Sequence, residues 1–162
     1  MTEPHWLSPE QLAAWTRLVA VVELLPGALD TQLQHDADLT HFEYFTLAML
    51  SEAEGRSLRM TRLASRTNAT LPRLSHVVSR LERRGYVRRV PDVDDRRAIN
   101  AQLTDDGWQK VLETAPGHVD TVRQSVIDAL DERDVADMRR IMAKVLDRLD
   151  PDRRFGMTTG PM

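Results

Sequence analysis

Arginine side chains are concentrated in one quarter of this 162-residue chain. Between Arg56 and Arg97 there are 12 arginines against four acidic residues, a local balance of +8. The other 120 residues carry 10 basic and 21 acidic side chains, and the whole chain has a net charge of −3. Arginine presents a planar fork of N–H donors that fits a phosphate group or the edge of guanine. A basic segment inside an acidic body therefore indicates contact with a nucleic acid backbone.

Charge alone does not distinguish a nucleic-acid-binding surface from an arginine-rich surface that is only solvated. The elements predicted to carry these side chains separate the two. Hydrophobic residues recur at three- and four-residue spacing from Leu71 to Leu81, which predicts the buried stripe of an α-helix. Thr70 stands where a hydroxyl caps the first turn, and Gly85 stands where a left-handed residue ends a helix. The polar side of this predicted helix carries Pro72, Arg73, Ser75, His76, Ser79, Arg80 and Arg83.

The residues after Gly85 are expected to form a β-hairpin with a charged tip. Residues 86–91 contain aromatic and β-branched side chains, and residues 98–103 alternate between apolar and polar side chains. The polar turn between them has the sequence DVDDRR. Thr104, followed by two aspartates, predicts the start of the next helix. A capped helix followed by such a hairpin is the order of parts with which a protein reads duplex DNA by a helix and a wing.

Two segments carry a resemblance to a known family, RMTRLASRTNATLPRLSHVVSRLERRGYVRR and DVDDRRAINAQLTDDGW. On these motifs, and over roughly Trp6 to Leu149, the chain resembles the MarR family of winged helix-turn-helix transcriptional regulators. The resemblance implies a mainly α-helical fold with a small β-hairpin wing and with N- and C-terminal dimerisation helices. It also implies a ligand-responsive repressor that binds double-stranded DNA as a homodimer. The family's wing pattern, an acid, one spacer and an arginine, is matched by Asp95, Arg96 and Arg97.

In this arrangement the predicted helix enters a major groove and Arg97 enters the adjacent minor groove of a pseudo-palindromic site, whose half-sites lie about 34 to 36 Å apart. Pro72 and His76 are predicted to meet base edges, although His76 in contact with a phosphate is the alternative. Arg73 and Arg80 are predicted to contact guanine or phosphate, and Asp95 to orient Arg97 or its neighbour. The predicted DNA-binding residues are Thr70, Pro72, Arg73, Ser75, His76, Ser79, Arg80, Arg83, Asp95, Arg96 and Arg97; of these, Thr70, Ser75 and Ser79 are expected to position phosphates.

The segments on either side of this module are expected to be helical. Capping boxes begin helices at Ser8 and Thr40, and Asp131 caps the last helix. Pro26-Gly27 predicts a kink or pause, and Pro116-Gly117 predicts a bend in a helix from residue 104 to about residue 130. The apolar stripes of these helices exceed what a winged domain of about 90 residues covers, so we expect a two-fold homodimer; a helical cap on a monomer is the alternative. The predicted division is a dimerisation segment at 1–36, a winged domain at 37–104, dimerisation helices at 105–149 and a flexible tail at 150–162.

Two kinds of small-ligand site are considered. The resemblance implies a pocket for small aromatic or phenolic anions between the dimer helices and the winged domain, for which we predict Trp6, Trp15, Arg17, His41 and Phe45; ordinary packing of these residues is the alternative. Three aspartates in the wing offer too few oxygen ligands for a hard cation. A histidine and carboxylate metal sensor is the other alternative, formed by His35, Asp36, His41 and Glu43. We expect neither a metal nor a cofactor.

Composition and motifs exclude several other classes of protein. The absence of cysteine excludes a disulfide framework, a thiolate zinc site and a thiol switch. No uninterrupted apolar run reaches the roughly 18 residues that span a bilayer, and MTEPHW lacks the features of a signal peptide. No GxSxG, HExxH or glycine-rich phosphate loop is present, so we expect no enzyme. We expect a cytoplasmic regulator without a membrane partner. The alternative function is a winged module used only for contacts with other proteins.

Overall fold

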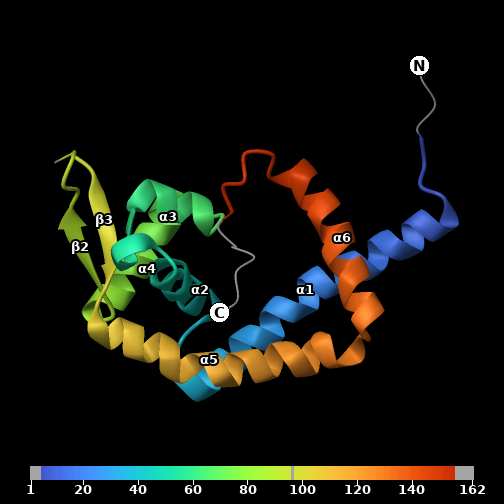
Figure 1. Ribbon diagram of the computed structural model, residues 1–162, viewed down its shortest axis with the longest axis horizontal. Helices are drawn as coiled ribbons and strands as arrows, with labels where there is room; N and C mark the ends of the chain where they lie inside the picture. Colours follow the sequence, from blue (N-terminus) through green and yellow to red (C-terminus); the bar gives the residue numbers. More distant parts are fainter. Residues whose placement is uncertain (1–4, 96, 156–162) are drawn as a thin grey trace.

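The computed structural model describes residues 5–95 and 97–155, and in this range it is helical with one small sheet, as predicted (Figure 1). The winged part, α2 to β3, lies at one end, while α1, α5 and α6 extend away from it. The elements in chain order are α1 (Pro9–Ala37), α2 (His41–Ser51), a 3₁₀ turn (Glu54–Arg56), β1 (Ser57–Arg59), α3 (Met60–Arg66), α4 (Leu71–Arg83), β2 (Val87–Pro91), β3 (Ile99–Leu103), α5 (Asp105–Ser125), a second 3₁₀ turn (Ile127–Ala129) and α6 (Glu132–Leu149).

Helix starts follow the local capping signals. The side chains of Ser8, Thr40 and Asp131 each accept a hydrogen bond from the backbone three residues on, and each third residue returns one, so all three are capping boxes. Thr70 and Thr104 cap α4 and α5 through single hydrogen bonds. The predicted starts of these helices are confirmed.

The wing contains one strand more than the predicted hairpin. The sheet order is β1-β3-β2, and both pairs are antiparallel. The third strand, β1, spans only Ser57–Arg59 and lies between a 3₁₀ turn and α3. Three residues are too few to show a period of two, which is why the sequence pattern did not predict this strand. Ala101 and Leu103 of β3 are buried, whereas Ile99, two residues earlier on the same side of the strand, is 40% exposed.

The hydrophobic core joins α2, α3 and α4 to the inner face of the sheet. Leu47, Leu63, Leu74, Val78 and Leu81 are fully buried in it. Four of the five α4 positions predicted to face inward are buried, namely Leu74, Val77, Val78 and Leu81. The prediction is wrong for Leu71, which lies in the first turn outside the core and is 44% exposed. Helix α4 is therefore fixed along one side, and its polar side remains for other contacts.

Helices α1 and α5 pack against each other and connect the winged part to the rest of the chain. A kink or a pause was predicted at Pro26; helix α1 runs through it as one helix, so the pause does not occur, and the kink stays a prediction. Proline removes only one backbone donor, and 29 residues of helix leave full turns on both sides of it. Helix α5 also continues through Pro116, but it ends at Ser125, before the expected residue 130.

Two helices expose apolar side chains that no described residue covers. Helix α6 has no buried residue along its length. In the outer half of α1, Leu12, Trp15 and Val22 are about half exposed. By length and composition alone, α1 is the one helix in the described part of the chain that is long and apolar enough to cross a membrane, although it has no uninterrupted apolar run of that length.

Candidate nucleic-acid interface

The outward side of α4 presents a small set of exposed side chains. Pro72, His76 and Arg83 are exposed, and each lies on a different turn of the helix. Gly85 has a φ of 78° and ends the helix in the left-handed conformation, as predicted. These three residues remain predicted DNA contacts because neither a hydrogen bond nor an ion pair of their side chains is seen among the described residues.

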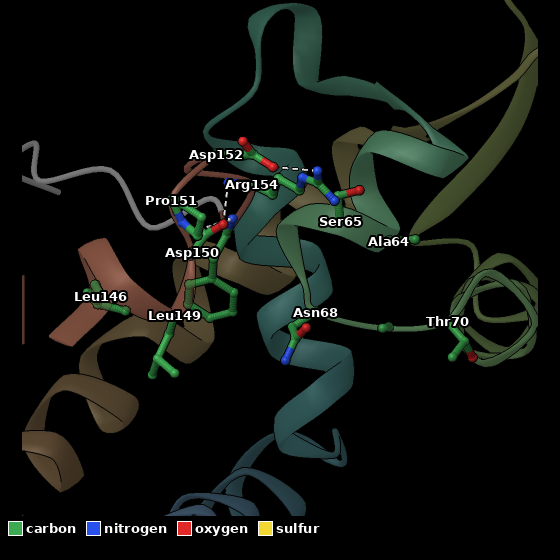
Figure 2. A pocket seen from close by; sticks show the side chains of 12 residues that line it. Ala64, Ser65, Asn68, Thr70, Leu146, Leu149, Asp150, Pro151, Asp152 and Arg154 are labelled. Carbon is green, nitrogen blue, oxygen red and sulfur yellow. Dashed lines mark hydrogen bonds and ion pairs between the residues drawn. The ribbon is translucent and has the colours of Figure 1, made fainter.

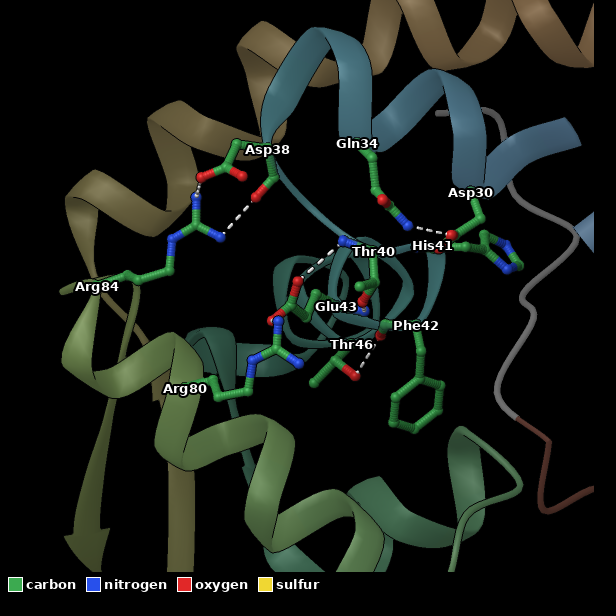
Figure 3. Close-up of polar contacts among 10 residues, drawn as sticks. All are labelled: Asp30, Gln34, Asp38, Thr40, His41, Phe42, Glu43, Thr46, Arg80 and Arg84. Carbon is green, nitrogen blue, oxygen red and sulfur yellow. Dashed lines mark hydrogen bonds and ion pairs between the residues drawn. The ribbon is translucent and has the colours of Figure 1, made fainter. Parts of the chain in front are cut away.

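The other predicted α4 residues contact the protein itself. The guanidinium of Arg73 lies over the ring of Phe42 in α2, 4.3 Å from the ring centroid. Arg80 Nη2 lies 3.0 Å from Glu43 Oε1, also in α2 (Figure 3). The hydroxyls of Ser75 and Ser79 both accept from Arg89 of β2. These contacts hold the flanks of α4 to the scaffold, and they leave the DNA roles of these residues as predictions.

Glu43 is a buried carboxylate at the start of α2. Only 1% of its surface is exposed, and its Oε2 accepts from the backbone N–H of Thr40 at 2.8 Å. Its Oε1 faces Arg80 but accepts no well-aligned hydrogen bond from any described residue. The contact with Arg80 is therefore ionic. It joins α2 to α4 across 37 positions of sequence, which the capping box alone did not predict.

The wing tip is built around Asp92. Arg59 at the end of β1 donates two hydrogen bonds to its carboxylate, at 2.9 and 3.0 Å. The backbone N–H groups of Asp94 and Asp95 also donate to Asp92 Oδ1. Mainly because of the Arg59 guanidinium, the pKa of Asp92 is lowered to about 2. One aspartate thus folds the turn and attaches it to the neighbouring strand.

The predicted wing arginine is exposed at this tip. Asp95 accepts a 3.0 Å hydrogen bond from the backbone N–H of Arg97, so the acid and spacer pattern shapes the turn. The side chain of Arg97 lines a cavity of about 340 Å³ between the wing and the start of α4, together with Arg59, Thr61 and Ser75. Arg96, which was also predicted to contact DNA, lies outside the described residues.

The residues proposed for metal binding are engaged in other contacts. Asp92 pairs with Arg59, and Glu43 pairs with Arg80. His35 Nδ1 lies 2.6 Å from Asp36 Oδ1 on the surface of α1. The residues that the structure describes contain no group of three or more histidine, aspartate or glutamate side chains suited to hold a metal ion.

The five residues predicted to bind an effector lie in separate places. His41 and Phe45 stack, with ring centroids 6.4 Å apart, in the part of α2 that faces α1. Trp6 is 81% exposed and Trp15 is 55% exposed, toward the outer end of α1. Arg17 donates to the backbone carbonyl of Ala13 in the same helix. Within one chain, these side chains do not form a common pocket.

A cavity of about 680 Å³ lies elsewhere, between the turn joining α3 to α4 and the end of α6 with the residues that follow it (Figure 2). Asn68 and Thr70 line one side of it, and Leu149 and Phe155 line the other. The Phe155 ring lies 5.6 Å from the ring of Phe45, so the first residues of the predicted tail contact the winged part. None of the five predicted effector residues lines this cavity.

A pair of histidines near the junction of α1, α2 and α5 was also not predicted. The ring of His118 in α5 lies 4.7 Å from that of Tyr44. Burial lowers the pKa of His118, and the nearby His41 lowers it further. Burial likewise lowers the pKa of His41, while Asp30 acts in the opposite direction. Both imidazoles are therefore held toward the neutral form.

Arg89 was not predicted as a site residue; it entered only as one of the 12 arginines of the basic segment. Strand alternation contained the signal, because Val87 is buried, Arg88 is exposed and Arg89 returns to the inner side. An arginine at an inward strand position requires acceptors there. Arg59 and Phe42 gave no comparable signal, because their partners lie far away in the sequence.

Comparison with known proteins is consistent with this geometry. A model of the MarR family matches residues 37–98. The chain is similar to Sco3205, a MarR family transcriptional regulator from Streptomyces coelicolor solved in complex with DNA, with 43% identity, a TM-score of 0.87, and 93% of this chain and 94% of Sco3205 covered. AbsC, a MarR family transcriptional regulator from the same organism, is 35% identical with a TM-score of 0.84, and 90% of this chain and 98% of AbsC are covered.

A curated relative extends the likeness to a protein with a stated role. The transcriptional repressor MprA of Escherichia coli is 29% identical over 124 residues, which are 74% of this chain and 67% of MprA. The identity to Sco3205 over nearly the full length of both chains exceeds what a shared fold alone requires. The chain belongs to the MarR family of winged helix-turn-helix transcriptional regulators, as its sequence motifs indicated, and it is not an enzyme.

Proposed function

We propose that this regulator is a repressor that binds a pseudo-palindromic duplex as a homodimer, with α4 in the major groove and Arg97 of the wing in the adjacent minor groove. The observation that carries the proposal is the division of α4 into a fixed side and an exposed side. The flanking residues Arg73, Arg80 and Ser79 contact the scaffold, whereas Pro72, His76 and Arg83 face outward. A helix held in this way presents its outer side chains to base edges in a defined orientation.

The charge distribution supports the same orientation. The basic segment from Arg56 to Arg97 includes α3, α4 and the wing, while the rest of the chain is acidic. An acidic body repels the phosphate backbone, and a basic reading surface attracts it, so the duplex approaches from the winged end. The narrow minor groove of A·T-rich sequence favours an arginine such as Arg97.

The homodimer is supported by the apolar faces of the outer helices. Val135, Ile141, Met142, Leu146 and Leu149 of α6 are all exposed. Fully burying an exposed side chain of this kind contributes about 1.5 to 3 kcal/mol, and these residues, 36 to 76% exposed, would each gain a part of it, so together they favour association. The exposed apolar residues of α1, such as Leu12, Trp15 and Val22, form a second uncovered surface. We propose that the same partner covers both. A second copy is the natural partner because a two-fold dimer also matches a two-fold operator.

We also propose that a small-molecule effector controls DNA binding. A small aromatic or phenolic anion is what the family resemblance implies. His41 and Phe45 lie at the junction of α1 and α2, where a bound molecule would influence how the winged part is held. The cytoplasm is the proposed location because that is where a bacterial-type repressor meets its operator.

The deciding experiment is selection of duplexes from a random-sequence pool by the purified full chain, followed by titration at several salt concentrations. Recovery of an inverted repeat, bound by one dimer with a steep dependence on salt, would support the proposal. Equal and weak binding to every duplex would contradict it and favour a winged module for protein contacts. Sedimentation in buffer without detergent measures the oligomeric state. A dimer supports the proposal, whereas aggregation would indicate that the apolar helix α1 needs a membrane.

A further inference from the structure

Arg89 of β2 contacts α4 on three successive turns. Its Nη2 donates to the carbonyl of Ser75 at 2.9 Å and to the hydroxyl of Ser79 at 3.0 Å. Its Nη1 donates to the carboxylate of Glu82 at 2.5 Å, and its backbone N–H donates to the same carboxylate at 3.0 Å. Ser75, Ser79 and Glu82 are spaced by four and three residues and so form one stripe of the helix. A single side chain therefore joins the wing strand to the recognition helix.

This contact gives the two serines a role different from the predicted one. The Ser75 hydroxyl also lies within 3.3 Å of Arg89 Nη2, and the Ser79 hydroxyl donates to the carbonyl of Ser75. Both hydroxyls are partly buried and point toward the wing strand. In the free chain both hydroxyls are thus directed toward Arg89, and a phosphate contact stays a prediction for them. The pair of serines completes the acceptor set of Arg89.

The connection continues from Arg89 to the wing tip. Arg89 lies opposite Ala101 in the ladder between β2 and β3, and the ladder ends at the pair of Pro91 and Ile99. Beyond that pair, Arg59 and Asp92 fix the turn that carries Arg97. Arg89 thus joins α4 to the base of the wing, and Arg59 attaches the tip of the wing to β1.

We propose that Arg89 is a positioning residue that holds the wing at a fixed angle to α4, so that the major-groove and minor-groove contacts are made together. This inference rests on the proposed placement of α4 and Arg97 on DNA. Arginine suits the role because its planar fork reaches several acceptors at once, whereas lysine offers a single point charge on a flexible chain. The side chain of Arg89 is 27% exposed, which leaves it little surface for a phosphate.

Arg88 provides a matched control on the same strand. Its side chain points to the opposite side and is exposed, and it donates to Gln102 at 2.9 Å. Arg88→Lys therefore makes the same chemical change one residue away without touching α4. Ser75→Ala with Ser79→Ala provides the complementary variant, because it removes acceptors of Arg89 and leaves the arginine in place.

The first measurement is amide hydrogen exchange in the free full-length protein, which does not depend on DNA. Arg89→Lys should speed exchange in β2 and β3 at least fivefold and leave α2 and α3 unchanged, since local opening follows the loss of local contacts. The double serine variant should show the same pattern to a smaller degree, and Arg88→Lys should show none. Unchanged exchange in β2 and β3 of Arg89→Lys would overturn the inference.

The second measurement is dimethyl sulfate footprinting on a duplex selected by the wild-type protein, because this reagent reports guanine N7 in the major groove and adenine N3 in the minor groove. Arg89→Lys should lose adenine protection, keep guanine protection and bind about tenfold more weakly. Equal loss of protection in both grooves would reduce Arg89 to a stability residue, and unchanged adenine protection would mean that it does not position the wing; either result overturns the inference. If the wild-type protein selects no duplex, the proposed function fails, and the exchange experiment still decides the role of Arg89.

Discussion

Arg80 Nη2 lies 3.0 Å from the buried Oε1 of Glu43, so a residue expected to face DNA neutralises a carboxylate inside the protein (Figure 3). The exposure of the two side chains differs, at 43% for Arg80 and 1% for Glu43. A single substitution at either end therefore has unequal consequences. Loss of Arg80 leaves a buried charge without compensation, whereas loss of the Glu43 charge leaves an arginine that water can solvate.

We expect Arg80→Ala to lower the free energy of unfolding by about 1 to 3 kcal/mol, less than for a fully buried pair because Arg80 is partly solvated. Glu43→Gln with Arg80→Ala should recover part of this loss, since the amide removes the uncompensated charge. Urea denaturation at a fixed protein concentration measures both variants. Additive effects in the double variant would show that the two side chains do not interact in solution.

The role of Arg97 is tested by removing its side chain. Arg97→Ala should weaken binding to the selected duplex at least tenfold and reduce protection in the minor groove, because the predicted contact at the wing tip is lost. The dimer should remain intact in sedimentation, since Arg97 is exposed and the wing strands β2 and β3 lie at the opposite end of the chain from α6 (Figure 1). Unchanged affinity would remove the wing from the binding mechanism.

Local signals predicted the helices of this fold better than they predicted the site. The caps at Ser8, Thr40, Thr70 and Asp131 require only residues within one helical turn, and the structure confirms each of them. The predicted pause at Pro26 was wrong because one missing donor does not end a long helix. Capping residues thus identify where a helix begins, and periodicity identifies which side it buries. A single proline inside the pattern is not enough to predict where a helix ends.

The partners of the site residues could not be predicted for a different reason. Arg80 and Glu43 lie 37 positions apart, and Arg59 and Asp92 lie 33 positions apart. A sequence pattern places each side chain on a face of its own element, but packing of α2 against α4, and of β1 beside β3, decides which faces meet. For that reason arginines that support the interface could not be separated from arginines that face outward.

The pKa of Asp92 leads to a pH prediction. Its folded value of about 2 is below the ordinary aspartate value of 3.8, so the contact stabilises the wing fully above about pH 4 and is lost as the pH falls through 2. Amide exchange or NMR shifts of Asp94 and Asp95 should therefore change between pH 4 and 2. Asp92→Asn should have a looser turn at neutral pH and lack this transition. A transition near pH 4 in the wild-type protein would mean that Arg59 does not hold the carboxylate in solution.

We predict that His76, which is exposed on the outer side of α4, reads a base edge. His76→Ala should remove discrimination at one position in each half-site, by about 1 to 3 kcal/mol for that base pair. Repeating the duplex selection with the variant measures this directly. A uniform loss across all sequences would make His76 a phosphate contact, which is the alternative that its position also allows. Arg83→Ala, at the other end of the same exposed side, serves as the comparison.

Helix α6 provides the test of the dimer, because it has no buried residue in the single chain and can be changed without disturbing the core. Ile141 is 44% exposed on the apolar side of α6, and Ala143 is exposed about 200° around the helix from it. Ile141→Lys should shift the protein toward a monomer in sedimentation and weaken operator binding by more than tenfold, since each half-site would then be bound separately. Ala143→Lys adds the same charge and should remain dimeric. If Ile141→Lys also remains a dimer with unchanged affinity, the apolar side of α6 is not the interface, and the association must use the exposed residues of α1 instead.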